Sequence, residues 1–151
     1  MKNDINWNFD NTYSKLPESF REIIKPVKVK SPNLILLNKS LAAHLDLDFS
    51  GLNQSELSEL FTGNELPKNS NSIAQAYAGH QFGHFTMLGD GRAVLIGEHT
   101  TKLNKKYDIQ FKGSGKTAFS RNGDGRAALG PMLREYVISE AMNGLKIPTT
   151  R

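Results

Sequence analysis

Hydrophobic and polar residues alternate along the segment that ends at Lys112. Tyr107, Ile109 and Phe111 are apolar, whereas the residues that follow each of them are polar. A period of two is typical of a strand with one buried face. The alternation therefore predicts a strand whose last residue, Lys112, points away from the apolar side, towards solvent or a cleft.

Two further strand-like segments, residues 81–88 and 93–98, flank the turn sequence GDGR at residues 89–92. Asp-Gly between two strands is among the strongest local signals for a hairpin. Together with the strand that ends at Lys112, these segments predict an antiparallel sheet from about residue 73 to residue 112.

A helix is expected from Pro131, which suits a first helical turn, to Gly144, which suits a helix end. Residues on one of its faces recur at helical spacing: Leu133, Tyr136, Val137, Glu140 and Ala141. We expect this face to pack on the sheet that carries Lys112. Glu135 and Glu140 are both candidates to pair with Lys112, and the periodicity does not choose between them.

The sequence of the first half predicts three helices, over residues 16–24, 40–47 and 55–61. It also predicts one strand, over residues 33–37. Pro26 should end the first helix, Ser40 should introduce the second, and Gly63 should stop the third.

Residues 67–72 have the composition of a linker, with proline, asparagine and serine side by side. We place a domain boundary there. The expected fold class is α+β, with an N-terminal helical extension, residues 1–71, packed on a sheet-and-helix lobe, residues 72–151.

The pentapeptide Gly-Asp-Gly-Arg-Ala occurs twice, at residues 89–93 and 123–127. Glycine lets a ligand approach the backbone, and arginine offers a planar fork of donors for phosphate oxygens. The first copy alone is also explained as an ordinary hairpin turn. Because the second copy precedes a helix instead of a strand, the repetition favours a shared ligand. With Lys112 between the copies, we predict a phosphate-binding site.

Residues 113–117, Gly-Ser-Gly-Lys-Thr, resemble the end of a P-loop. The full motif requires a glycine where this chain has Gln110, and a helix directly after Thr117. Residues 118–123 have the composition of a further loop, so we do not predict a P-loop.

His80 and His84 lie four residues apart, a spacing that could hold a metal ion on a helix. The surrounding glycines and aromatic residues indicate a strand or a loop, and no third ligand is near in sequence. Packing or hydrogen bonding is the better interpretation of both histidines.

The chain has 151 residues, no cysteine and a formal net charge of +4. Disulfides and thiolate metal sites are therefore excluded. No apolar run is long enough to cross a bilayer, and residues 1–10 are too polar for a secretory signal, so we expect a cytoplasmic protein with no membrane partner. The positive charge permits nucleic-acid binding, but the basic residues are scattered and form no recognition motif, so nucleic acid is not an expected partner.

Several linked motifs of the second half resemble, in order and spacing, the selenoprotein O family of protein adenylyltransferases. The motifs are YAGHQFG (77–83), LGDGRA (88–93), KGSG (112–115), SRNGDGRA (120–127), RE (134–135), SEAM (139–142) and IPTTR (147–151). Before residue 75 the similarity is looser.

This resemblance implies a protein-kinase-like fold that transfers AMP from ATP to hydroxyl side chains of proteins, with ATP inverted relative to ordinary kinases. Nucleotide-binding roles are implied at matching positions: Gly89, Gly91, Arg92, Lys112, Asp124 and Gly125. The resemblance also implies that Glu135 is the partner of Lys112. From the residues alone, Asp124 could orient Arg126, cap the next helix or contact the nucleotide.

Family members continue past the position of Arg151 into a larger lobe. That lobe carries the catalytic aspartate, the ligands for Mg²⁺ or Mn²⁺, and further arginines that bind phosphate. We therefore expect an N-terminal fragment that has no catalytic residue and is inactive alone. A non-catalytic nucleotide-binding scaffold or regulatory module is the alternative.

Overall fold

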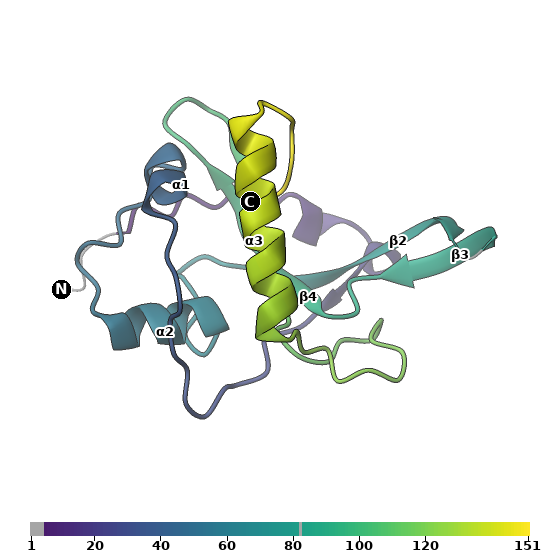
Figure 1. Ribbon diagram of the computed structural model, residues 1–151. Coiled ribbons are helices and arrows are strands. Elements are labelled where there is room, and N and C mark those ends of the chain that lie inside the picture. The colour runs from purple at the N-terminus through teal and green to yellow at the C-terminus, as the bar shows by residue number, and fades with distance from the viewer. Residues whose placement is uncertain (1–4, 82) are drawn as a thin grey trace.

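Antiparallel strands form the centre of the computed structural model, which describes residues 5–81 and 83–151 (Figure 1). The strands are β1 (Arg21–Ile23), β2 (Ile73–Gln81), β3 (His84–Gly89), β4 (Ala93–Thr100) and β5 (Lys106–Lys112). They form one sheet of order β1-β2-β4-β5, in which β3 also pairs with β2. An α+β fold with an antiparallel sheet over residues 73–112 is thus confirmed.

Strand β5 alternates as its sequence predicts. Tyr107, Ile109 and Phe111 are partly buried, and the polar residues between them are exposed. Lys112 stands opposite Ala93 in the register of β4 and β5, so the end of β5 lies beside the turn that precedes β4. The inner strand β4 is buried from residue 94 to residue 99.

Strand β2 is long enough to pair with three other strands. Its first three residues, 73–75, pair with β1, and Ile73 also pairs with Leu95 of β4. Its remaining residues pair with β3 and form a hairpin that projects from the sheet (Figure 1). The strand expected over residues 81–88 is shorter, since β3 begins at His84. The hairpin expected across residues 89–92 is wrong, because β3 pairs with β2 and the next strand, β4, pairs with β2 and β5. Phe82 lies outside the described residues.

Two short helices lie between β1 and β2 in the sequence. Helix α1 (Lys39–His44) is capped by the side chain of Asn38, two residues before the expected Ser40. Helix α2 (Gln54–Thr62) begins with a capping box between Asn53 and Glu56, and ends at Gly63 with φ 77°. Both expected helices are present, but α1 ends at His44 instead of Leu47 and its N-cap is Asn38 instead of Ser40. Glycine suits the left-handed conformation at the end of α2.

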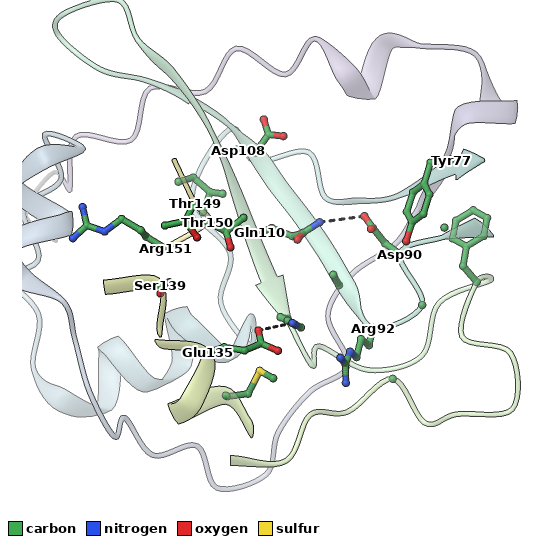
Figure 2. A pocket seen from close by; sticks show the side chains of 18 of the residues that line it. Tyr77, Asp90, Arg92, Asp108, Gln110, Glu135, Ser139, Thr149, Thr150 and Arg151 are labelled. Carbon is green, nitrogen blue, oxygen red and sulfur yellow. Dashed lines mark hydrogen bonds and ion pairs between the residues drawn. The ribbon is translucent and has the colours of Figure 1, made fainter. Parts of the chain in front are cut away.

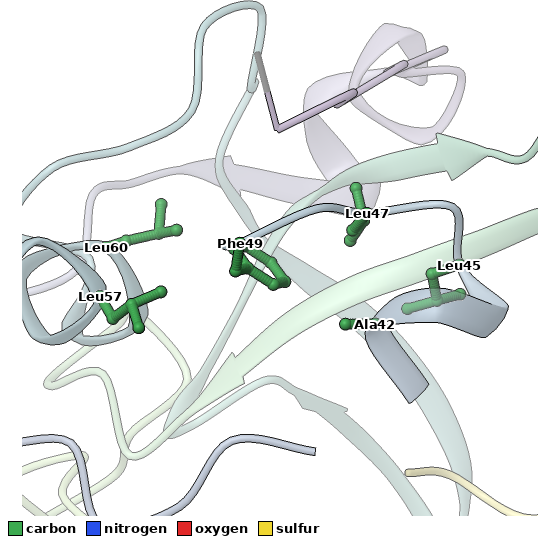
Figure 3. Packing of buried hydrophobic residues seen from close by; sticks show 6 residues of the cluster. All are labelled: Ala42, Leu45, Leu47, Phe49, Leu57 and Leu60. Atoms are coloured by element: carbon green, nitrogen blue, oxygen red, sulfur yellow. The ribbon is translucent and has the colours of Figure 1, made fainter. Parts of the chain in front are cut away.

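The helices and the loop between them build the main apolar cluster (Figure 3). Its buried members are Ala42, Leu45, Leu47, Phe49, Leu57 and Leu60. Tyr107 and Ile109 pack against this cluster from β5. The N-terminal part therefore covers the apolar face of β5 and leaves the face that carries Lys112 open.

The helix expected over residues 16–24 is wrong. Two 3₁₀ turns, Tyr13–Lys15 and Glu18–Phe20, are followed there by strand β1. Pro17 disfavours a helical conformation at Leu16, whose ψ is 159°, and so ends the first turn. Residues 21–23 then pair with β2.

The strand expected over residues 33–37 is also wrong, since none of these described residues belongs to a strand. The segment runs beside α2 instead of beside another strand. The backbone N–H of Leu34 donates to the side chain of Ser58 at 2.9 Å. A hydrogen bond to a side chain of α2 thus takes the place of the backbone hydrogen bonds that a neighbouring strand would supply.

Helix α3 (Leu129–Gly144) begins two residues earlier than expected and places Pro131 in its first turn. The face expected to pack on the sheet is wrong in part. Tyr136 and Glu140 of that face are partly buried, but Val137 is 61% exposed and Leu133 is 39% exposed. Met132 and Ser139, which were not expected on this face, are also partly buried. Apolar residues of α3 occur on most of its sides, so the sequence did not mark one face as the buried face.

Residues 67–72 form a turn and a short connection, and the N–H of Asn71 donates to the carbonyl of Ile96 in β4. Strand β1, from the first 71 residues, belongs to the same sheet as β2. The division at residues 71 and 72 stays a prediction.

Candidate functional site

A cavity of about 1670 Å³ is bounded by the sheet, α3 and the segment between β5 and α3 (Figure 2). Its lining includes all seven residues that the sequence nominated: Gly89, Gly91, Arg92, Lys112, Asp124, Gly125 and Glu135. These residues come from two turns, a strand end and a helix, so tertiary structure brings them together.

The most direct contact in the cavity joins Lys112 and Glu135. Lys112 is the last residue of β5, and its Nζ donates to Oε2 of Glu135 in α3 at 2.5 Å. This hydrogen bond and the charge of Lys112 lower the pKa of the Glu135 carboxyl. Both side chains are more than one-third exposed, so the pair contributes little to stability. Its main effect is to fix the direction of the ammonium.

Glu140, the other candidate partner, pairs elsewhere. Its carboxylate accepts two bonds from the Arg151 guanidinium, at 2.8 and 2.9 Å. These bonds lower the pKa of Glu140 and tie the end of the chain to α3.

Arg92 lies next to the Lys112–Glu135 pair. The carbonyl of Arg92 accepts from the N–H of Gly113 at 2.6 Å, directly after Lys112. Its positive charge also helps to lower the pKa of Glu135. Figure 2 shows Arg92 and Glu135 near the end of β5. Two cations and one carboxylate therefore leave a net positive charge at this end of the cavity.

The turn at residues 89–92 is anchored through Asp90. The N–H of Asp90 donates to the carbonyl of Gln75 at 2.9 Å, and Oδ2 of Asp90 accepts from the N–H of Gln75 at 3.1 Å. Gln110 of β5 donates to the same Oδ2 at 3.3 Å (Figure 2). Burial raises the pKa of Asp90, against these hydrogen bonds. No local pattern in the sequence indicated that Asp90 anchors the turn.

The glycines of the first pentapeptide are in contact with another segment of the chain. A Cβ at residue 89 would stand 2.2 Å from the Phe119 ring, and one at residue 91 would stand 2.7 Å from the Phe119 carbonyl oxygen. Packing against Phe119 is therefore a reason for these glycines that the sequence did not reveal.

The second pentapeptide has its own structural requirements. Gly125 has φ 70°, and a Cβ there would stand 1.9 Å from the carbonyl oxygen of Gly115. Asp124 accepts from the backbone N–H of Arg126 at 2.9 Å. It does not cap α3, whose N-cap is Ala128. The hydrogen bond from the Arg126 N–H agrees with the expectation that Asp124 orients Arg126.

The segment that resembles a P-loop has a different structure. No helix follows Thr117 before α3 begins at Leu129. The Thr117 hydroxyl donates to the carbonyl of Asp90 at 2.7 Å. Residues 113–117 therefore do not form a P-loop, in agreement with the prediction from the sequence.

His80 and His84 lie on β2 and β3, as the strand or loop interpretation predicted. Among residues 5–81 and 83–151, no group of three or more histidine, aspartate or glutamate side chains is placed to hold a metal ion. No helix in the same described part is both long and apolar enough to span a membrane.

The cavity also contains polar residues that the sequence analysis did not nominate. Asp108 and Gln110 extend the row of outward residues on β5, and Ser139 adds a hydroxyl from α3. Thr149 and Thr150 line it from the C-terminal segment. The alternation of β5 was the one signal that could have indicated Asp108 and Gln110.

Comparison with known proteins gives one consistent result. The sequence model of the family described as "Protein adenylyltransferase SelO" matches residues 3–151. A relative from Pelagibacter ubique called "Protein nucleotidyltransferase YdiU" is 71% identical over 147 residues, which are 97% of this chain and 30% of the relative. Relatives with the same name from Nitrosococcus oceani and Brevibacillus brevis are 62% and 59% identical over 98% and 96% of this chain.

Each of these three relatives is covered to 30% of its length, so this chain spans about three tenths of the curated relatives it matches. The family match extends through the N-terminal helices, where the motifs alone indicated only a looser similarity. The resemblance drawn from the second half of the sequence is confirmed: the chain belongs to the SelO family of protein adenylyltransferases.

Proposed function

We propose that this chain supplies part of the ATP site of a kinase-like enzyme that transfers AMP to serine, threonine or tyrosine hydroxyls of proteins. In this proposal the sheet and α3 correspond to the N-terminal lobe of the kinase-like fold. The observation that carries it is the Lys112–Glu135 ion pair beside Arg92, in one cavity with the glycine-rich turn.

The chemistry fits this arrangement. In AMP transfer, a hydroxyl oxygen attacks the α-phosphorus. The bond between the α-phosphorus and the oxygen that bridges it to the β-phosphorus then breaks, and pyrophosphate leaves. Negative charge grows on the departing oxygen, where cations stabilise it. Lys112 and Arg92 supply two positive charges, and Glu135 holds the ammonium in position.

Other parts of the reaction need residues beyond those placed here. The hydroxyl proton requires a base, and we assign that base to the remainder of the protein. The described residues do not fit a Mg²⁺ or Mn²⁺ site, because they contain no group of three or more histidine, aspartate or glutamate side chains placed to hold a metal ion. We propose that its ligands also belong to the remainder, and that the present chain alone does not transfer AMP.

Nucleotide titration of the full-length protein tests the site. Lys112→Ala and Arg92→Ala should each weaken ATP binding by about tenfold or more, because a charge-assisted hydrogen bond contributes roughly 1.5–3 kcal/mol. Lys105→Ala removes an exposed lysine away from the cavity and should bind ATP as the parent does. Unchanged affinity in both site variants would exclude the proposed site.

The position of the isotopic label tests the reaction class. ATP labelled at the α-phosphate should label an acceptor protein in the presence of the full-length enzyme, whereas ATP labelled at the γ-phosphate should not. The opposite result would identify phosphoryl transfer.

A further inference from the structure

Residues 117–120 pack over the glycine-rich turn that precedes β4. We propose that Thr117, Phe119 and Ser120, here called the clasp, are positioning residues that hold this turn in the shape that binds phosphate. The inference rests on the proposed function, since it names what keeps the ATP site in order.

Two hydroxyl groups of the clasp bind the two central carbonyls of the turn. Thr117 Oγ1 donates to the Asp90 carbonyl at 2.7 Å, and Ser120 Oγ donates to the Gly91 carbonyl at 2.5 Å. Thr117 is 6% exposed and Ser120 is 9% exposed. Bonds shielded from water in this way resist replacement by solvent, so they fix both peptide planes.

The orientation of those peptides has a consequence for anion binding. In a trans peptide, the N–H points opposite to the carbonyl of the same unit. With the Asp90 and Gly91 carbonyls held towards the clasp, the next two N–H groups, of Gly91 and Arg92, point away from it. Successive N–H groups directed to one side form a concave site for an anion, and here the guanidinium of Arg92 stands beside them.

The Phe119 ring completes the contact from the same side. It occupies the place where a side chain at residue 89 would begin, with only 2.2 Å to an ideal Cβ. The ring therefore blocks movement of the turn towards the clasp. A glycine at residue 89 is what makes this close packing possible.

The clasp is itself ordered by internal bonds. The N–H of Thr117 donates to Ser120 Oγ at 2.7 Å, and the N–H of Phe119 donates to Thr117 Oγ1 at 3.1 Å. Glu22 of β1 accepts from the N–H of Ala118 at 2.7 Å. The clasp is thus attached to the sheet, and it gives Thr117 of the P-loop-like motif a structural partner in place of a metal ion.

The test uses the full-length protein and separates the hydroxyl from the shape of the side chain. Thr117→Val removes the hydroxyl with little change in volume, and Thr117→Ser restores it. Thr62→Val is the matched control, because the Thr62 hydroxyl also donates to a backbone carbonyl at 2.7 Å, that of Ser58 in α2. Affinities for ATP and adenosine, measured by competition with a fluorescent nucleotide, are compared with the melting temperature of each variant.

We expect Thr117→Val to weaken ATP binding by about tenfold and leave adenosine binding unchanged, because the loss falls on the phosphates. Thr117→Ser should bind ATP within about twofold of the parent, and Thr62→Val should lower the melting temperature without changing ATP affinity. If Thr117→Val weakens the binding of ATP and adenosine equally, or weakens neither, the proposed function of the clasp is wrong. If Lys112→Ala weakens ATP binding and Thr117→Val does not, the clasp alone fails. If neither does, the proposed ATP site fails as well.

Discussion

At the scale of single residues, the exposed Lys112–Glu135 pair orients a side chain more than it stabilises the fold. Water screens both charges, so their attraction adds little to the free energy of unfolding. Yet the 2.5 Å bond restricts a long, flexible side chain to one direction. A ligand that meets an already oriented ammonium loses less conformational entropy on binding.

The two glutamates of α3 provide a test of that orientation. Glu135→Gln should weaken ATP binding several-fold, because the amide holds the ammonium less firmly than a carboxylate does. Glu140→Gln should leave ATP affinity close to that of the parent, since Glu140 binds Arg151. Isothermal titration of the full-length variants with ATP measures the difference. Equal affinities in the two variants would argue against a positioning function for Glu135.

The Glu135 pair also has a defined pH window. In the folded protein the pKa of the Glu135 carboxyl is lowered, chiefly by the hydrogen bond from Lys112. The ion pair is therefore fully formed above the ordinary glutamate pKa. It is lost as the pH falls through the lowered value.

The two pentapeptides allow a comparison between glycines in the same sequence context. Gly125→Ala should destabilise the fold by roughly 2 kcal/mol or more, because φ is 70° and the Cβ would overlap the Gly115 carbonyl. Gly123→Ala should stay within about 0.5 kcal/mol of the parent, since the nearest atom is 3.4 Å from its Cβ. Chemical denaturation measures both values, and a reversed order would contradict the structure.

At the scale of elements, Asp90 connects the turn at residues 89–92 to two strands. Its backbone and carboxylate both bond to Gln75 of β2, and Gln110 of β5 adds a third bond. One aspartate therefore fixes the turn relative to the strand that carries Lys112. The cost is partial desolvation of a carboxylate, which raises its pKa.

Replacement of Asp90 by asparagine should separate the hydrogen bonds from the charge. Asn keeps an acceptor oxygen but removes the charge that burial disfavours, so Asp90→Asn should melt at the same temperature as the parent at pH 7, or up to a few degrees higher. Because the folded pKa is raised, this advantage should shrink as the pH falls through it towards the ordinary aspartate value. Thermal melts at several pH values measure the trend, and a widening gap at low pH would contradict the assignment.

At the scale of the whole molecule, His99 joins the N-terminal segment, helix α1 and the sheet. The buried ring accepts from the N–H of Asn8 at 3.2 Å and bonds to the carbonyl of Leu45 at 2.7 Å. These bonds fit the neutral ring with its proton on Nε2. Phe9 also forms a β-bridge with His99. Residues separated by more than 50 positions thus depend on one side chain.

Removal of this ring should be costly. His99→Ala leaves a cavity and an unpaired Leu45 carbonyl, for an expected loss of about 3 kcal/mol, or roughly 6–12 °C in melting temperature. His44→Ala, which alters an exposed histidine that bonds to Tyr107, should cost less than about 1 kcal/mol. Differential scanning calorimetry of both variants measures the contrast, and similar melting temperatures would count against this connection.

Local patterns determined much of the fold. The alternation of β5 and the helix signals around Ser40, Gly63 and Pro131 act between near neighbours, so the sequence displays them directly. The hairpin expected at the Asp-Gly turn is wrong, because β3 pairs with β2, whereas β4 pairs with β2 and β5. The same reasoning failed at residues 16–24 and 33–37. There the outcome depended on β2 and on Ser58, which are distant partners that a local pattern does not contain.

The sequence by itself determined which chemical groups were available: the glycine-rich turns, the cations and the glutamates of α3. Only the tertiary structure decided their relations, because a contact depends on where separate elements meet in space. It placed Glu135 instead of Glu140 against Lys112, turned Asp90 towards the sheet, and placed Phe119 against Gly89. No spacing along the chain specifies these contacts, because they depend on how the sheet and the segments that cover it pack together.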